Sequence, residues 1–168
     1  IYDGVDAVML SAETAIGAHP EKVIRAVDKI AIETEKDPLY FQNLETSRTS
    51  SKEGVSNAIT VAAREVADNI NVKVICCFTH GGTTAELASR ERPRAPIIAL
   101  TPYVETARKL TLFWGLHCVV TTPVDRFKRA VMNAVKAAKL FDFASGKDLI
   151  IVIAGVPFNT PGSTNILR

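Results

Sequence analysis

The chain has 168 residues, of which 47% are hydrophobic and 23% are charged, and its formal net charge at pH 7 is +2. This balance is typical of a cytoplasmic globular protein with a buried core: no signal peptide is visible, and no apolar run approaches the roughly 20 residues that span a membrane. The net charge is small, and the Lys and Arg residues are dispersed along the sequence. Both observations argue against a nucleic-acid partner.

The first predicted element is a buried strand over residues 5–10, which form a short apolar run. Three polar residues, Ser11, Glu13 and Thr14, follow its carboxyl end. In parallel α/β architectures, ligands bind at the carboxyl ends of the strands. The three side chains are therefore candidate site residues, and capping of the turn after the strand is the structural alternative.

A helix is predicted next, because Pro20 suits a first helical turn and apolar residues recur on one face as far as Ile30. One strand and one helix cannot bury both of their faces, so we expect residues 1–34 to pack against protein outside the chain. Residues 35–53 are predicted to be a linker, since Asp37-Pro38 breaks the helical pattern and a polar Ser- and Thr-rich stretch follows.

Residues 54–168 alternate between helical and strand patterns. Helices are predicted over residues 55–70, after the turn at 79–84, and from the Thr-Pro pairs at 101–102 and 122–123. Strands are predicted at 74–78, 96–100, 116–120 and 149–154, with an edge strand at 165–168. This alternation predicts a three-layer α/β/α domain with a mostly parallel sheet of about five strands.

The turn after the strand at 74–78 is the main candidate binding site. It reads Thr79-His80-Gly81-Gly82-Thr83-Thr84 and leads into a helix. The free N–H groups and dipole of a helix N-terminus favour anions, glycines allow close approach, and Thr hydroxyls suit phosphate oxygens. A turn of this composition that binds nothing is the alternative. The turn has no Walker lysine and no G-x-G-x-x-G spacing, so nucleotide hydrolysis is not indicated.

A second polar loop follows the strand at 149–154 and contains Pro161, Gly162, Ser163 and Thr164. If the strands are parallel, both loops lie at the same sheet edge and can form one pocket for a phosphorylated small molecule. A purely structural connection is the alternative. His80 either adds positive charge to this pocket at low pH or is a solvated loop residue.

The motifs resemble those of one known family. The opening Asp3-Gly4-x-Asp6-x-x-Met9-Leu10-Ser11-x-Glu13-Thr14-Ala15-x-Gly17-x-x-Pro20 resembles the segment that ends the catalytic (β/α)8 barrel of pyruvate kinase. The polar linker, the turn at 79–84, residues 103–108, Trp114-Gly115 and the loop at 161–165 resemble the carboxyl-terminal domain of that enzyme. The resemblance covers the whole chain but only about the last third of such an enzyme.

The resemblance implies a part of a glycolytic enzyme that transfers a phosphoryl group from phosphoenolpyruvate to ADP with Mg²⁺ and K⁺. It implies that residues 1–34 are the last strand and helix of the barrel, with 54–168 as the effector and assembly domain. The family's catalytic and Mg²⁺-binding residues lie upstream of Ile1, so we expect this chain alone to be inactive and to bind no metal. Ser11, Glu13 and Thr14 match positions at the edge of the active site.

The resemblance also implies a phosphorylated effector and a homotetramer of identical subunits. Members that respond to fructose 1,6-bisphosphate often have Ser where this chain has Gly81, and several have an Arg that the second loop lacks. A monophosphate, a nucleoside monophosphate or an empty pocket therefore remain open. A stand-alone phosphate-sensing domain and a purely structural oligomerisation domain are the competing functions.

Overall fold

The computed structural model describes residues 1–47, 53–158, 160 and 162–168. The chain divides into two compact units, Ile1–Ser50 and Ser51–Arg168. Within the described part of the chain, no helix is both long and apolar enough to cross a membrane.

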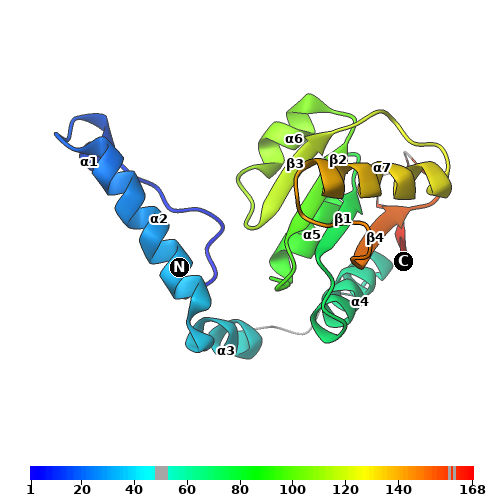
Figure 1. Ribbon diagram of the computed structural model, residues 1–168, viewed down its shortest axis with the longest axis horizontal. Helices are drawn as coiled ribbons and strands as arrows, with labels where there is room; N and C mark the ends of the chain where they lie inside the picture. Colours follow the sequence, from blue (N-terminus) through cyan, green and yellow to red (C-terminus); the bar gives the residue numbers. More distant parts are fainter. Residues whose placement is uncertain (48–52, 159, 161) are drawn as a thin grey trace. The chain divides into compact units, whose positions relative to one another are not determined.

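The first unit contains three helices, α1 (Ala12–Ala15), α2 (Pro20–Lys36) and α3 (Pro38–Ser47) (Figure 1). Pro20 occupies the first turn of α2, as predicted. Part of the predicted linker is helical, since α3 covers Pro38–Ser47. The Asp37 side chain accepts the N–H of Leu39 at 2.9 Å, so the Asp-Pro pair that ends α2 also caps the next helix. Residues 48–52 of the predicted linker lie outside the described residues.

The predicted strand at residues 5–10 is not formed. Val5 and Val8 are about half exposed, and Met9 is 90% exposed. A strand is stabilised by backbone hydrogen bonds to a neighbouring strand, and the described residues of this unit contain no strand that pairs with it. The apolar composition of the segment is therefore not matched by burial within the unit.

The second unit is built on a sheet in the order β3-β2-β1-β4-β5. Its strands are β1 (Val74–Phe78), β2 (Ile97–Thr101), β3 (Leu116–Val120), β4 (Ile150–Gly155) and β5 (Thr164–Leu167). The first four strands are parallel, whereas β5 runs antiparallel to β4 at the edge. This architecture confirms the predicted mostly parallel sheet of about five strands with a final edge strand.

Helices cover both faces of this sheet (Figure 1). They are α4 (Val55–Asn69), α5 (Thr83–Arg90), α6 (Val104–Leu110) and α7 (Phe127–Leu140). Side chains of β1 alternate between two cores: Ile75 and Cys77 pack with residues of α4, α5 and α6, whereas Cys76 and Phe78 pack with α7. The three-layer arrangement is confirmed, and the adjacent Cys76 and Cys77 point to opposite faces of the sheet.

Two helices begin later than the Thr-Pro pairs predicted. Thr101 ends β2, and its hydroxyl accepts the N–H of Tyr103 at 3.3 Å, so α6 begins only at Val104. The segment 121–125 has no regular structure, its Val124 side chain is buried, and α7 begins at Phe127. In both places a short polar segment lies between the end of a strand and the next helix.

Candidate functional site

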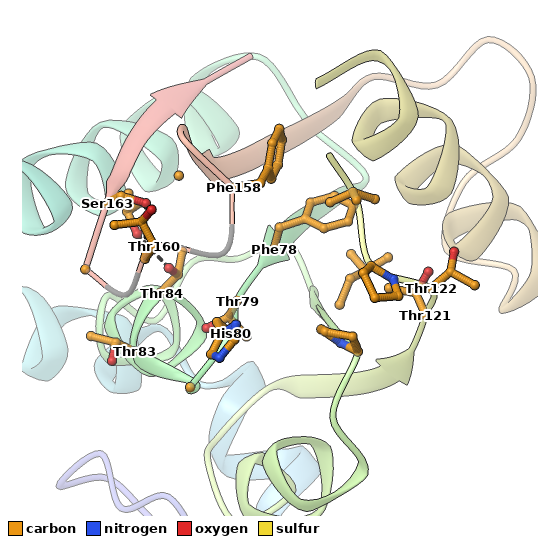
Figure 2. A pocket seen from close by; sticks show the side chains of 18 residues that line it. Phe78, Thr79, His80, Thr83, Thr84, Thr121, Thr122, Phe158, Thr160 and Ser163 are labelled. Atoms are coloured by element: carbon orange, nitrogen blue, oxygen red, sulfur yellow. Dashed lines mark hydrogen bonds between the residues drawn. The ribbon is translucent and has the colours of Figure 1, made fainter. Parts of the chain in front are cut away.

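A cavity of about 120 Å³ lies at the carboxyl ends of the parallel strands (Figure 2). Its walls come from the turn at 79–84 after β1, the loop after β4, and the segment 121–124 after β3. Strands β1 and β4 are neighbours although they are far apart in sequence, so the chain order reverses between them. A crevice outside such a reversal is where open α/β sheets commonly bind ligands.

The turn at the start of α5 depends on Gly82. This residue has φ +108° and caps the helix, and its N–H donates to the buried Thr79 hydroxyl at 2.9 Å. A Cβ at Gly82 would lie 3.1 Å from Glu86 Oε1, so a larger residue would strain the turn. Gly81 differs, because a Cβ there would meet no atom within 4 Å. Gly82 therefore shapes the turn, and Gly81 forms an open part of the wall.

A hydroxyl pair joins the two loops. Thr84 in the first turn of α5 and Thr164 at the start of β5 have their Oγ1 atoms 2.6 Å apart. Both residues are buried, with 7% and 4% of their surface exposed. Each hydroxyl carries one proton, and one donor makes this contact. The second O–H is therefore available to another acceptor at the pocket wall that both residues line.

The loop between β4 and β5 is held by its own polar side chains. The amide of Asn165 accepts the N–H of Val156 at 3.0 Å and donates to its carbonyl at 2.6 Å. The Ser163 hydroxyl donates to the Thr160 carbonyl at 2.7 Å. A Cβ at Gly155 would lie 2.3 Å from Ser163 Oγ, so the loop folds back closely on the end of β4. These contacts form this wall of the pocket without a ligand.

His80 is partly buried in the pocket wall. Its ring contacts that of Tyr103 edge to face, with centroids 4.6 Å apart, and its carbonyl accepts the Thr106 hydroxyl at 3.1 Å. The Nδ1 atom is buried and has no hydrogen-bond partner among the described residues. His80 is therefore a turn residue that remains partly exposed while the start of α6 packs against it.

The described residues that line the pocket include no Lys, Arg, Asp or Glu. Attraction for an anion would come from the first turn of α5, where backbone N–H groups and the helix dipole carry partial positive charge. Thr79, Thr83 and Thr84 add hydroxyls at the same end of the pocket. The arrangement suits a group that accepts several hydrogen bonds, and it offers no general base beyond His80.

Most of the residues predicted for this site lie together. Thr79, His80, Gly81, Thr83, Thr84, Gly162, Ser163 and Thr164 line the pocket. Gly82 caps α5 and is not among the lining residues, and Pro161 lies outside the described residues. Sequence reasoning missed Thr121, Thr122 and Phe158. Figure 2 shows Thr121 and Thr122 across the pocket from His80 and Thr83. The Thr-Pro pair at 122–123 was the only sequence feature that drew attention to this segment, and we interpreted it as a helix start.

The other candidates belong to the first unit. Ser11 precedes α1, and its carbonyl accepts the Thr14 hydroxyl at 3.2 Å, so these two residues hold the turn. Glu13 is exposed, and a Cβ at Gly17 would lie 2.3 Å from its carbonyl oxygen. In the described part of the chain, no group of three or more His, Cys, Asp or Glu residues is arranged to hold a metal ion.

Comparisons with known proteins agree on one family. Residues 57–168 match the family model for the pyruvate kinase α/β domain. The whole chain is 41% identical to part of a pyruvate kinase of Methylorubrum extorquens and 44% identical to part of one from Agrobacterium vitis, covering 35% of each. A pyruvate kinase of Staphylococcus saprophyticus is 40% identical, with 29% of it covered. The chain thus spans about a third of the length of these relatives.

A solved structure agrees as well. The crystal structure of a pyruvate kinase from Cryptosporidium parvum superposes on 96% of this chain and 32% of its own, with a TM-score of 0.81 and 30% sequence identity.

Proposed function

The chain belongs to the pyruvate kinase family, in which residues 57–168 are the C-terminal α/β domain, and from that premise we propose that it is the effector-binding and assembly part of a pyruvate kinase. The whole enzyme would transfer a phosphoryl group from phosphoenolpyruvate to ADP with Mg²⁺ and K⁺, in the cytoplasm. Phosphoryl transfer depends on metal ions and on groups that position the phosphates. Neither the pocket nor the described acidic residues supply a metal site.

The chain by itself would therefore not catalyse the reaction. We expect no pyruvate formation above background when the purified chain is mixed with phosphoenolpyruvate, ADP, Mg²⁺ and K⁺ and pyruvate is followed through a coupling dehydrogenase. A full-length pyruvate kinase in the same assay is the control. Turnover that disappears on removal of Mg²⁺ would overturn this part of the proposal.

The pocket is the observation that supports the proposal that the domain binds an effector. It combines the first turn of an eight-residue helix with hydroxyls from two loops that are already joined by Thr84 and Thr164. Phosphate is recognised in this way in many α/β proteins. No Lys or Arg lines the described wall to hold a second phosphate, so a singly phosphorylated small molecule fits better than a bisphosphate.

Binding can be measured directly on the 168-residue chain by calorimetric titration with ribose 5-phosphate, glucose 6-phosphate, AMP and fructose 1,6-bisphosphate, with inorganic phosphate as the smallest probe. Saturable binding of a monophosphate, stronger than that of the bisphosphate, is the expected result. Binding of none of them would refute the effector site and favour a domain that serves assembly alone.

The first unit supports a role next to a catalytic barrel. Its large exposed apolar residues include Met9, Ile16, Ile24 and Ile30. A soluble protein rarely leaves so much apolar surface uncovered, so we assign residues 1–34 to the end of the barrel and residues 35–53 to the connection that contains α3. Ser11, Glu13 and Thr14 would then lie at the edge of the active site. Identical subunits, in a tetramer, would be the further partners.

A further inference from the structure

We infer that Phe158 determines the specificity of this pocket: it selects a phosphate monoester that carries a flat ring, as in a nucleoside monophosphate, over a phosphorylated sugar. The inference rests on the proposed function, since it names the class of ligand for the same pocket. The phosphate would lie at the first turn of α5, as proposed above. The remainder of the cavity wall is largely apolar and includes the Phe158 side chain.

The wall of the pocket divides into a hydroxyl-rich part and an apolar part. The hydroxyl-rich part consists of the turn at 79–84 and the end of the loop before β5. The apolar part is formed by six of the described side chains, Phe78, Leu100, Pro102, Pro123, Val124 and Phe158. Figure 2 shows the rings of Phe78 and Phe158 between Thr84 and Thr122. A ligand with its phosphate at α5 therefore places the rest of the molecule against apolar side chains.

The apolar side chains differ in their exposure. Phe78, Leu100 and Val124 are buried, with at most 8% of their surface exposed, and they form the deepest part of this wall. Phe158 is only partly buried, although it packs against the core cluster that contains Phe78 and the inner face of α7. Pro123 is exposed, so this side of the cavity opens to solvent. A flat ring that enters here contacts Phe158 and can extend out of the cavity.

The chemistry of the apolar part disfavours a sugar. A hydroxyl group that leaves water needs a new hydrogen-bond partner, and the described lining residues include no Asp, Glu, Asn, Gln, Lys or Arg. Beside Phe78, Leu100 and Val124, sugar hydroxyls would stay unpaired, whereas a flat ring buries its apolar faces without this cost. Stacking on an aromatic side chain adds affinity for a nucleobase, because every base has a π face.

AMP and ribose 5-phosphate are the matched probes, because they differ mainly in the adenine ring and their phosphates are mostly dianions at pH 7.5. We expect calorimetry on the full chain to show AMP binding about tenfold tighter than ribose 5-phosphate, with inorganic phosphate the weakest. In Phe158→Leu, which keeps an apolar side chain but removes the flat face, this ratio should fall below roughly threefold. Phe143→Leu should keep the parent's ratio, because Phe143 packs against the same core cluster and is not among the described lining residues.

The outcomes separate the inference from the proposed function. Equal binding of AMP and ribose 5-phosphate by the parent, tighter binding of ribose 5-phosphate, or an unchanged ratio in Phe158→Leu would overturn the role of Phe158 while the phosphate site stands. Absence of binding by AMP, ribose 5-phosphate and inorganic phosphate would overturn both. If Phe158→Leu fails to fold, nuclear magnetic resonance of the parent decides, because absence of magnetisation transfer from the Phe158 ring protons to the adenine protons contradicts the contact.

Discussion

Substitution of Gly81 tests the phosphate site most directly, because the pocket has room for a side chain there. A Cβ at Gly81 would have no neighbour within 4 Å, and the residue is not in the left-handed region of φ. Gly82 is unsuitable, since its φ of +108° and the nearby Glu86 would strain any replacement. Gly81→Asp therefore introduces a charge without strain, and Gly81→Asn is a control of nearly the same shape with no charge.

We expect Gly81→Asp to weaken phosphate binding about 100-fold for each charge that the phosphate carries. A carboxylate about 6 Å from the ligand, at an effective dielectric constant of about 20, raises the energy of each ligand charge by about 3 kcal/mol. Since about 1.4 kcal/mol corresponds to a tenfold change in affinity, this repulsion accounts for two orders of magnitude. The penalty should shrink as salt is added, because the pocket opens to solvent and mobile ions screen the two charges.

The assay is calorimetric titration of the parent, Gly81→Asp and Gly81→Asn with inorganic phosphate and with ribose 5-phosphate. Urea unfolding of each variant shows whether the fold is intact. The asparagine variant should bind within a few-fold of the parent. If the aspartate variant binds as well as the asparagine variant, then the phosphate does not lie against this turn and the reasoning is refuted. Equal losses in both variants would mean that shape, and not charge, governs the site.

Two further predictions concern stability. Thr84→Val or Thr164→Val alone should lower the free energy of unfolding by about 1–3 kcal/mol, because the other buried hydroxyl loses its partner. The double variant should lose less than the sum of the two single losses. Additive losses in urea unfolding would contradict this coupling. The backbone N–H and hydroxyl of Ser145 hold the pKa of Asp148 below its ordinary 3.8. The ionised Asp148 therefore stabilises the folded state above pH 3.8, and this contribution to the free energy of unfolding is lost as the pH falls through the lower pKa of the folded protein. Asp148→Asn should flatten this acid-side loss of stability, and an unchanged pH profile would refute it.

The sheet could be predicted from the sequence because its strands are short apolar runs rich in β-branched residues. The run at residues 74–78 became β1 and the run at 116–120 became β3 with the same bounds. Strand β1 is buried at every position, so each of its residues has to be apolar, whereas the edge strand β3 is only partly buried and includes His117. The bounds of β2, β4 and β5 differ from the prediction by one residue, which is within the ordinary uncertainty of strand ends.

The same signal misled at residues 5–10, where an apolar run exists but no described strand pairs with it. The composition of a segment indicates whether its side chains favour burial. Whether the segment forms a strand depends in addition on which other strands are present to pair with it. The start of α3 was missed for a different reason. An Asp-Pro pair can end one helix and cap the next, and only the hydrogen bond from the Leu39 N–H to Asp37 shows that both occur here.

The site was predictable where it depends on local turn chemistry. Glycines and threonines after β1 indicated a helix start that suits anions, and the parallel strands brought the second loop to the same edge. The third wall was not predictable, because Thr121 and Thr122 reach the pocket only through the pairing of β3 with β2. The burial of His80 Nδ1 was equally hidden, since it depends on how α6 packs against the turn.

The order of the strands places this pocket between two loops that are far apart in sequence. Strand β1 lies between β2 and β4, so the chain leaves the centre of the sheet in opposite directions and the loops after β1 and β4 separate. The cavity between them meets strand ends and the first turn of α5, and the described residues that line it include hydroxyl groups but no Lys or Arg. A phosphate there would be bound by N–H and O–H donors, and the titration of Gly81→Asp tests that arrangement directly.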